Sequence, residues 1–250
     1  MPKKLIQIST RGYYDLTNAR KRKNLMYSVS PKKKLQELYR TKELVIMIHG
    51  LRNDRFDARK KFLIAQRRLK QLGYRYPVIG FSYDSNTKGA HLKKSALRAL
   101  RVGQKIALQN GYNLSKFILD FKKQSPNTKI RLLGHSLGTE LIMSTLRQLY
   151  NYSNQNIIES VHFFGSSIPN ESIITKQYEK IFENVVRNKI KNYYSKLDKV
   201  LMESHQDNWI KNPIGCFATT KRVSSNFRHI HITPKNHRFA SYADKLKSFP

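Results

Sequence analysis

Short apolar runs alternate with longer amphipathic stretches along most of the chain. Apolar runs bounded by glycine, serine or proline favour buried strands, whereas apolar residues spaced one helical turn apart favour helices. Strands are predicted over residues 5–9, 43–50, 76–85, 128–136, 157–169, 186–195 and 227–234. Helices are predicted over residues 54–72, 88–123, 137–150 and 171–184. This alternation predicts an α/β fold with a mostly parallel central sheet and helices on both faces.

Helix signals are clearest in the stretch 54–72. Asp54 suits an N-cap, because its carboxylate can accept from free amide groups of the first turn, and Gly73 suits the C-terminal end. The apolar positions of this helix are Phe56, Phe62, Leu63, Leu69 and Leu72. The helix over 88–123 is expected to break near Gly111, since glycine weakens a helix.

The N-terminal part of the chain is polar and basic. Residues 11–43 predict either a surface arm or an edge hairpin. Because no repeat or low-complexity linker follows, we expect one domain over 1–250, with the strand and arm of 1–43 packed on it. Connections between predicted elements are short except for 195–226, so at most a minimal lid is expected; this stretch forms either part of an acyl pocket or a plain packed helix.

The chain is strongly basic. Its 48 Lys and Arg residues against 16 Asp and Glu give a net charge of +32, a field that attracts nucleic acid, anionic lipid headgroups and acidic surfaces. The helical stretches 54–72 and 88–110 carry most of the charge in the early part of the chain. In a doubly wound fold they should cover opposite faces of the sheet, which favours a spread field over one groove. The local candidates for polyanion contacts are Arg20, Lys21, Arg22, Lys23, Lys32, Lys33 and Lys34. A solvated basic surface is the alternative.

Compartment signals are few. No apolar run reaches the length of a membrane span, and residues 1–10 lack the apolar run of a signal peptide. Cys216 is the single cysteine, which excludes an internal disulfide and fits a reducing compartment. We therefore expect a cytoplasmic protein without a transmembrane segment.

The pentapeptide Gly134-His135-Ser136-Leu137-Gly138 matches G-x-S-x-G. The pattern alone is weak, and a plain glycine turn is the alternative. Here, however, an apolar strand runs directly into it and a helix starts directly after it, which is the context that a nucleophile elbow requires. Small residues two positions before and two after the serine give the sharp turn its room. We therefore predict Ser136 as a nucleophile.

A nucleophilic serine needs a histidine base and an orienting carboxylate, which in such folds follow it in the order acid, then histidine. His237 lies in the loop after the last predicted strand, where the base belongs. The other downstream histidines lie within predicted strands or a helix: His162, His205, His229 and His231. Asp198 is the aspartate that follows the penultimate strand, and it is the predicted acid. Its alternative role, as an N-cap, is compatible with catalysis.

An oxyanion hole needs two backbone N–H groups near the serine. Leu137, directly after the nucleophile, is one candidate, and Leu51, after the buried strand ending in His49-Gly50, is the other. The candidate rim residues are His49, Gly50, His135 and Asp84. Asp84 ends an earlier strand and either shapes the pocket or holds a loop. No cluster of histidine and cysteine has metal-ligand spacing, so no metal or other cofactor is expected.

Several blocks together resemble a known family. VIMIHGLRNDRFDA, PVIGFSYDSNT, IRLLGHSLGTELI, HFFGSSIP, NYYSKLDKVL and PKNHRFASY occur in the order typical of α/β-hydrolase-fold proteins. Over residues 6–243 the chain looks most like a largely uncharacterised group of archaeal serine-hydrolase-like proteins, although it is basic where many of these are acidic. The resemblance implies the triad Ser136, Asp198 and His237, with oxyanion donors from Leu51 and Leu137.

These observations predict a serine esterase with a Ser-Asp-His catalytic triad. Its expected partner is a small ester-like substrate, and its chemistry resembles that of a carboxylesterase or lipase. The alternative is a basic binding protein on a hydrolase scaffold, which associates with nucleic acid or another polyanion through its charge.

Overall fold

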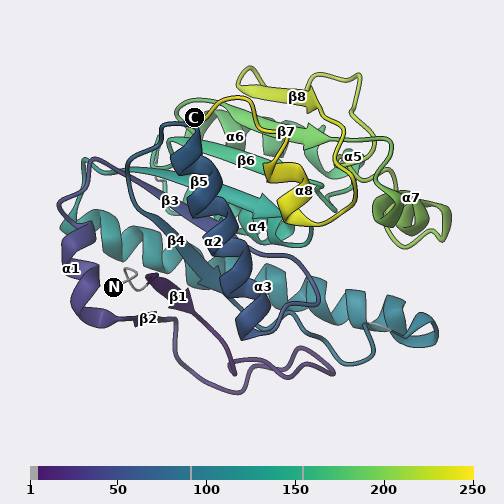
Figure 1. The fold of residues 1–250 in the computed structure, drawn as a ribbon, viewed down its shortest axis with the longest axis horizontal. Coiled ribbons are helices and arrows are strands. Elements are labelled where there is room, and N and C mark those ends of the chain that lie inside the picture. The colour runs from purple at the N-terminus through teal and green to yellow at the C-terminus, as the bar shows by residue number, and fades with distance from the viewer. Residues whose placement is uncertain (1–4, 91, 154) are drawn as a thin grey trace.

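The computed structural model describes residues 5–90, 92–153 and 155–250. In this part of the chain eight strands form one sheet in the order β2-β1-β4-β3-β5-β6-β7-β8, and β2 alone is antiparallel to its neighbour (Figure 1). The strands are β1 (Gln7–Ser9), β2 (Ser28–Ser30), β3 (Glu43–Ile48), β4 (Val78–Ser82), β5 (Lys129–His135), β6 (Ser160–Phe164), β7 (Ile190–Tyr194) and β8 (Phe227–His231). The predicted α/β-hydrolase fold is confirmed.

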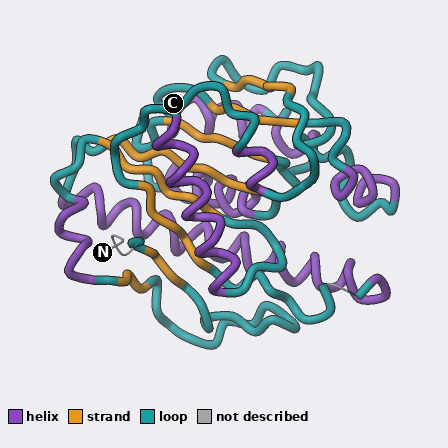
Figure 2. The backbone as a smooth tube through the Cα atoms, viewed as in Figure 1, coloured by secondary structure: helices purple, strands orange, loops and turns teal. Residues whose placement is uncertain are grey.

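Helices cover both faces of the sheet (Figure 2). They are α1 (Leu35–Leu38), α2 (Arg55–Gln71), α3 (Ala96–Gln124), α4 (Gly138–Asn151), α5 (Asn170–Ile173), α6 (Lys176–Val185), α7 (Lys199–Gln206) and α8 (Phe239–Ala243). Alternate residues of β3 enter two separate cores. Leu44, Ile46 and Ile48 pack with α3, α4 and α6, whereas Val45 and Met47 pack with α2 and α8. The alternation follows from the two-residue side-chain period of a strand.

The N-terminal segment belongs to the sheet and is not simply a surface arm. Gln7 pairs with Ser30 in the antiparallel edge pair of β1 and β2, so the edge-hairpin alternative is the better description. Tyr13 and Tyr14, in the loop that joins β1 to β2, are buried. The Tyr14 hydroxyl accepts a hydrogen bond from the side-chain amide of Asn113 on α3 at 2.8 Å. The position of β1 and β2 at the edge of the sheet therefore depends on contacts with residues far along the chain, such as Asn113.

Several predicted helix details are wrong. α3 begins at Ala96 and runs unbroken through Gly111. Glycine at this position serves packing between helices: a Cβ there would lie 2.4 Å from the Cβ of Ser144 on α4. The stretch 171–184 forms two helices, α5 and α6, and the Thr175 hydroxyl caps the second. In α2, Asp54 is the N-cap as predicted, but Phe56 is 73% exposed, and two alanines share the buried face with Phe62 and Leu69.

The connection after β7 crosses the end of the sheet where strands finish. It contains α7, and the chain after that helix returns to β8. The Arg101 guanidinium of α3 donates to the Trp209 carbonyl in this connection at 3.2 Å. Within the described residues, no helix is long and apolar enough to cross a membrane.

Candidate active site

Ser136 occupies a tight turn between β5 and α4. Its backbone φ is +51°, a left-handed conformation that costs a residue with a side chain about 1–3 kcal/mol. The Thr139 hydroxyl holds the turn by donating to the Ser136 carbonyl at 2.6 Å. A Cβ at Gly138 would come within 2.6 Å of the His49 carbonyl oxygen, so only glycine fits there. The strand, turn and helix expected around Ser136 are therefore present.

The structure brings Ser136, His237 and Asp198 together. The Ser136 hydroxyl donates to Nε2 of His237 at 2.9 Å, and Nδ1–H of His237 donates to Oδ2 of Asp198 at 2.7 Å. The three residues follow the ends of β5, β8 and β7 respectively, and these ends meet at one edge of the parallel sheet. Asp198 is fully buried, while the His237 side chain retains slight exposure. The arrangement has the geometry of a nucleophile, base and orienting acid.

Asp198 makes more hydrogen bonds than the triad requires. Its Oδ1 accepts from the Leu201 amide at 3.2 Å, so it is also the N-cap of α7, and its Oδ2 accepts a short bond from the Tyr242 hydroxyl. Burial would raise the pKa of Asp198, but hydrogen bonding and charge attraction from His237, with the bonds from Tyr242 and Leu201, outweigh burial and hold that pKa below its usual value. Asp198 is thus an ionised carboxylate at neutral pH.

His135 supports His237 from within the turn. Its Nε2–H donates to the His237 backbone carbonyl at 2.7 Å, and the two ring centroids lie 5.0 Å apart. Burial, together with charge on His237, lowers the pKa of His135 to about 3, so this imidazole is neutral. Among the described residues its Nδ1 has no partner. The predicted rim residue therefore positions the loop that carries His237.

The loop after β3 lies directly against the serine. A Cβ on Gly50 would come within 2.9 Å of the Ser136 Cβ, which places the Gly50 backbone in contact with the turn. Neither the Leu51 amide nor the Leu137 amide donates to a protein acceptor within the ranges that the structure describes. Both predicted oxyanion donors are therefore free N–H groups on segments that flank Ser136.

His49 organises this loop as a buried neutral base. Its Nε2 accepts from the Tyr83 amide at 3.2 Å and from the Arg11 guanidinium at 3.1 Å, which leaves the proton on Nδ1 to be donated to the Gly50 carbonyl at 3.0 Å. Burial and then the positive charge of Arg11 lower the pKa of His49 far below its usual value. His49 therefore fixes Gly50, and does not titrate near neutral pH.

Arg11 fastens the same loop from the N-terminal segment. It donates to the backbone carbonyls of Asn53 and Asp54, at 2.9 and 3.0 Å, and to the Ser82 hydroxyl at 2.9 Å. Of the two alternatives for residues 11–43, a surface arm and an edge hairpin, these contacts of Arg11 also favour a segment packed on the sheet. The segment is a structural part of the site's edge.

Asp84 holds a loop and does not contact the triad. Its carboxylate accepts from three consecutive amides, those of Gly12, Tyr13 and Tyr14, at 3.0 to 3.1 Å. Of the two roles considered from the sequence, loop anchoring is therefore the one that the contacts support.

The basic candidates between residues 20 and 34 lie at the far edge of the sheet, next to β2 and four positions from β5. All are exposed except Lys34, which is partly buried. Arg22 pairs with Asp15, and the Lys23 ammonium lies 5.9 Å from the Tyr13 ring centroid. These residues are separate from the triad.

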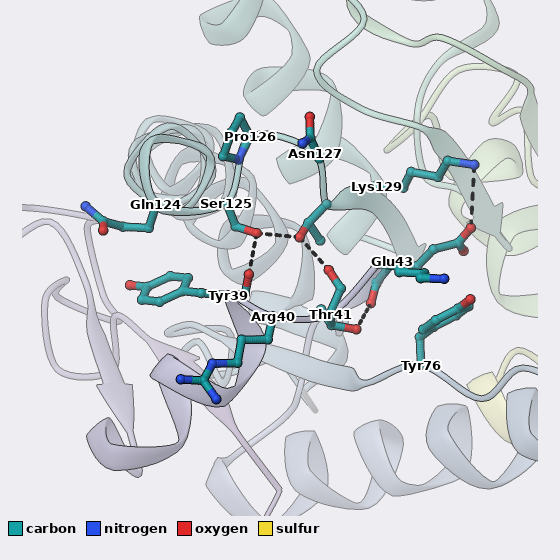
Figure 3. Close-up of a pocket in the computed structure, with 12 residues that line it drawn as sticks. Tyr39, Arg40, Thr41, Glu43, Tyr76, Gln124, Ser125, Pro126, Asn127 and Lys129 are labelled. Carbon is teal, nitrogen blue, oxygen red and sulfur yellow. Dashed lines mark hydrogen bonds and ion pairs between the residues drawn. The ribbon is translucent and has the colours of Figure 1, made fainter.

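A surface hollow of about 610 Å³ lies at the opposite end of the sheet, where β3 and β5 begin (Figure 3). The hydroxyls of Ser125 and Thr128 already have protein partners: they lie 2.6 Å apart, and each is also within hydrogen-bond distance of a backbone carbonyl, that of Tyr39 and of Thr41 respectively. Parallel α/β sheets bind ligands at the carboxyl ends of their strands. We therefore assign no chemistry to this hollow.

Two supporting residues were missed from the sequence. Tyr242 lies five positions after His237, on α8, and this spacing within the block PKNHRFASY was the available signal. Arg11 carried no local signal, because a single arginine in a basic segment does not reveal a buried partner.

A family model described as alpha/beta hydrolase of unknown function (DUF900) matches residues 28–212, well over half of the chain. The chain belongs to this family. The matched region contains Ser136 and Asp198, whereas His237 lies beyond it. No curated protein matches the chain.

Several solved structures are similar to this chain at low sequence identity. A lipase-esterase related protein from Clostridium acetobutylicum ATCC 824 is 11% identical over 82% of this chain and 91% of that one, with a TM-score of 0.43. The putative cell surface hydrolase from Lactobacillus plantarum WCFS1 is 13% identical over 77% and 83%, with a TM-score of 0.41. The catalytic core domain of acetyl xylan esterase from Trichoderma reesei is 10% identical over 53% and 66%, with a TM-score of 0.36. The chain thus spans less than two thirds of the acetyl xylan esterase chains that it matches.

Proposed function

We propose that this protein is a serine hydrolase that cleaves carboxylic esters, with a chemistry like that of carboxylesterases or lipases. One observation carries the proposal: the two hydrogen bonds that link Ser136 to His237 and His237 to Asp198, at 2.9 and 2.7 Å. The strained backbone at Ser136 and the two free amides beside it support the same reading. The resemblance to archaeal serine-hydrolase-like proteins agrees with it.

The first half of the reaction transfers the acyl group to the enzyme. His237 Nε2 takes the Ser136 proton as Oγ attacks the ester carbonyl, and the resulting oxyanion accepts from the N–H groups of Leu51 and Leu137. The ionised Asp198 keeps the proton on Nδ1 of His237 and stabilises the imidazolium. His237 then gives its new proton to the departing alkoxide, and Ser136 is left as an acyl ester.

The second half releases the acid. A water molecule gives a proton to His237 Nε2 and its oxygen attacks the acyl carbonyl, so that a second oxyanion forms in the same place. Collapse of this intermediate breaks the bond to Oγ, and the imidazolium returns its proton to Ser136. No net proton or electron is left on the enzyme.

A labelling experiment tests the proposal. A fluorophosphonate probe should react with the wild type and not with Ser136→Ala. Turnover of p-nitrophenyl acetate and butyrate should fall by roughly 10⁴-fold or more in that variant. Ser153→Ala, at an exposed serine, is the matched control and should label and turn over as the wild type. No labelling and no turnover of short or medium acyl esters by the folded wild type would sink the proposal.

A further inference from the structure

Two elements project beyond the strand ends on either side of the candidate site. Figure 1 shows α7 and the first turns of α3 extending past the arrowheads of the sheet. Both are attached to the site itself. α7 begins at Asp198, its N-cap, and a Cβ at Gly103 on α3 would come within 2.5 and 3.2 Å of the side chains of Leu51 and Leu137. The bases of both projections are therefore attached beside the candidate site.

Both projections carry apolar side chains in water. Leu197 and Val200, at the start of α7, are 68% and 49% exposed, and Leu97 on the first turns of α3 is also exposed. Phe56, at the start of α2 directly after the oxyanion loop, is the most exposed large apolar residue described. Apolar side chains gathered at one end of a soluble chain mark a surface that binds something apolar.

Basic residues lie between these apolar positions. Lys196 and Lys199 flank Leu197, and Lys94 and Arg98 flank Leu97; all four side chains are exposed. Within the described residues, none of the four forms an ion pair. The acids of α7, Glu203 and the adjacent Asp207, lie toward its other end. The projections thus combine free positive charge with aliphatic surface.

We propose that this end of the molecule docks on an anionic lipid surface, which presents the ester to Ser136. This inference rests on the proposed function. The lysines and arginine would lie at the lipid phosphates, while Leu197, Val200 and Leu97 enter the boundary of the acyl chains. Apart from Phe56, the exposed apolar side chains are aliphatic, and this favours lipid over single-stranded nucleic acid, whose binding relies on aromatic stacking platforms. The substrate class is an acyl ester held in, or partitioned into, a negatively charged membrane or lipid aggregate.

Vesicle sedimentation tests the docking separately from the chemistry. The wild type and Ser136→Ala should both bind vesicles of phosphatidylglycerol and phosphatidylcholine. Their binding should be at least tenfold weaker on pure phosphatidylcholine, and their binding to the anionic vesicles should weaken at high salt. The double variant L197S/V200S should bind the anionic vesicles at least tenfold less, as should K196Q/K199Q. Turnover of a soluble p-nitrophenyl ester by both double variants should stay within twofold of the wild type.

Matched controls lie elsewhere on the molecule. Leu25→Ser removes an equally exposed leucine, 57% accessible, and K32Q/K33Q removes two exposed lysines at the far edge of the sheet. Both controls should bind as the wild type. Equal losses in control and α7 variants, equal binding to neutral vesicles, or retention only on duplex DNA would overturn the inference. Absent vesicle binding with intact ester turnover defeats this inference alone, whereas vesicle binding without turnover or probe labelling defeats the proposed function.

Discussion

At the scale of single residues, Tyr242 gives the carboxylate of Asp198 a second proton donor. Its hydroxyl bonds the same Oδ2 that accepts from His237, and its ring is fully buried. A donor on that oxygen helps to hold the Asp198 carboxylate in place, and His237 takes its orientation from this carboxylate. Tyr242 is therefore a positioning residue.

Replacement of Tyr242 by phenylalanine tests this role. The ring remains, but the Asp198 carboxylate loses one of the donors that hold it, so His237 is less well oriented. We expect kcat to fall by about tenfold, with KM within about twofold of the wild type. The measurement is kcat and KM for ester turnover, together with urea unfolding. An unchanged kcat with reduced stability would show a purely structural role.

Glu140, one turn after the nucleophile, couples stability to pH. Burial raises its pKa to about 7 against hydrogen bonds from Ser167 and Gln104, which lower it. The folded state therefore holds this proton more tightly than the unfolded chain. Stability from Glu140 is fully present below its ordinary pKa near 4.5 and is lost as the pH rises through about 7.

Substitution of Glu140 by glutamine should remove this dependence. The free energy of unfolding of Glu140→Gln, minus that of the wild type, should be larger at pH 8 than at pH 5 by up to about 3 kcal/mol. Urea denaturation of both proteins at the two pH values measures it. The same difference at both values would mean that Glu140 is not protonated in the fold.

Residues of the candidate triad were predictable because chain order and strand ends locate them. Ser136, Asp198 and His237 each follow a strand, and the ends of parallel strands meet at one edge. Tyr242 and Arg11 were not predictable in the same way. Their roles depend on hydrogen bonds between segments that only the folded chain brings together.

At the scale of elements, replacement of Gly111 by alanine distinguishes two roles for this glycine. If Gly111 only weakened α3, alanine would stabilise the protein by up to about 1 kcal/mol. The contact with Ser144 predicts the opposite, because the added Cβ has no room between α3 and α4. We expect Gly111→Ala to cost about 1–3 kcal/mol, measured as a lower midpoint of urea unfolding. A higher midpoint would contradict the close approach.

Element types followed from the sequence more closely than element ends. β3 and β5 were predicted within two residues because apolar runs define them. α2 was predicted in place, but the choice of Phe56 and Leu63 as buried positions was wrong. Its inward positions are Ala58, Phe62, Ala65 and Leu69, so the predicted Phe62 and Leu69 do face the core, together with two alanines that the apolar spacing did not include. Spacing of large apolar residues alone therefore does not locate the whole buried face.

At the scale of the whole molecule, the charge of +32 opposes the folded state. Few acids are available to neutralise it locally, so the remaining repulsion is long-ranged and screened by salt. We expect NaCl at 500 mM, compared with 20 mM, to stabilise the protein by about 1–2 kcal/mol, or roughly 2–8 °C in Tm. Thermal unfolding monitored by circular dichroism measures this. A Tm that falls with salt would show that ion pairs dominate.

The α/β class was predictable from alternation, whereas the order of strands was not. β1 pairs with β4 and β2 closes the edge, although 19 residues separate the paired Ser9 and Ser28. The intervening loop is fixed by Asp84 and Asn113, which come from distant parts of the chain, and by its own Arg11, which donates to the distant Asn53 carbonyl. Local patterns carry no information on such pairings.

The site draws on both ends of the described chain. Arg11 fastens the loop beside Ser136, and His237, 101 residues after the serine, completes the relay together with Tyr242. During synthesis the elbow can form long before its base has been translated. Under the proposed function, a nascent chain therefore gains activity toward esters only after residues 237–242 have left the ribosome and docked beside Ser136.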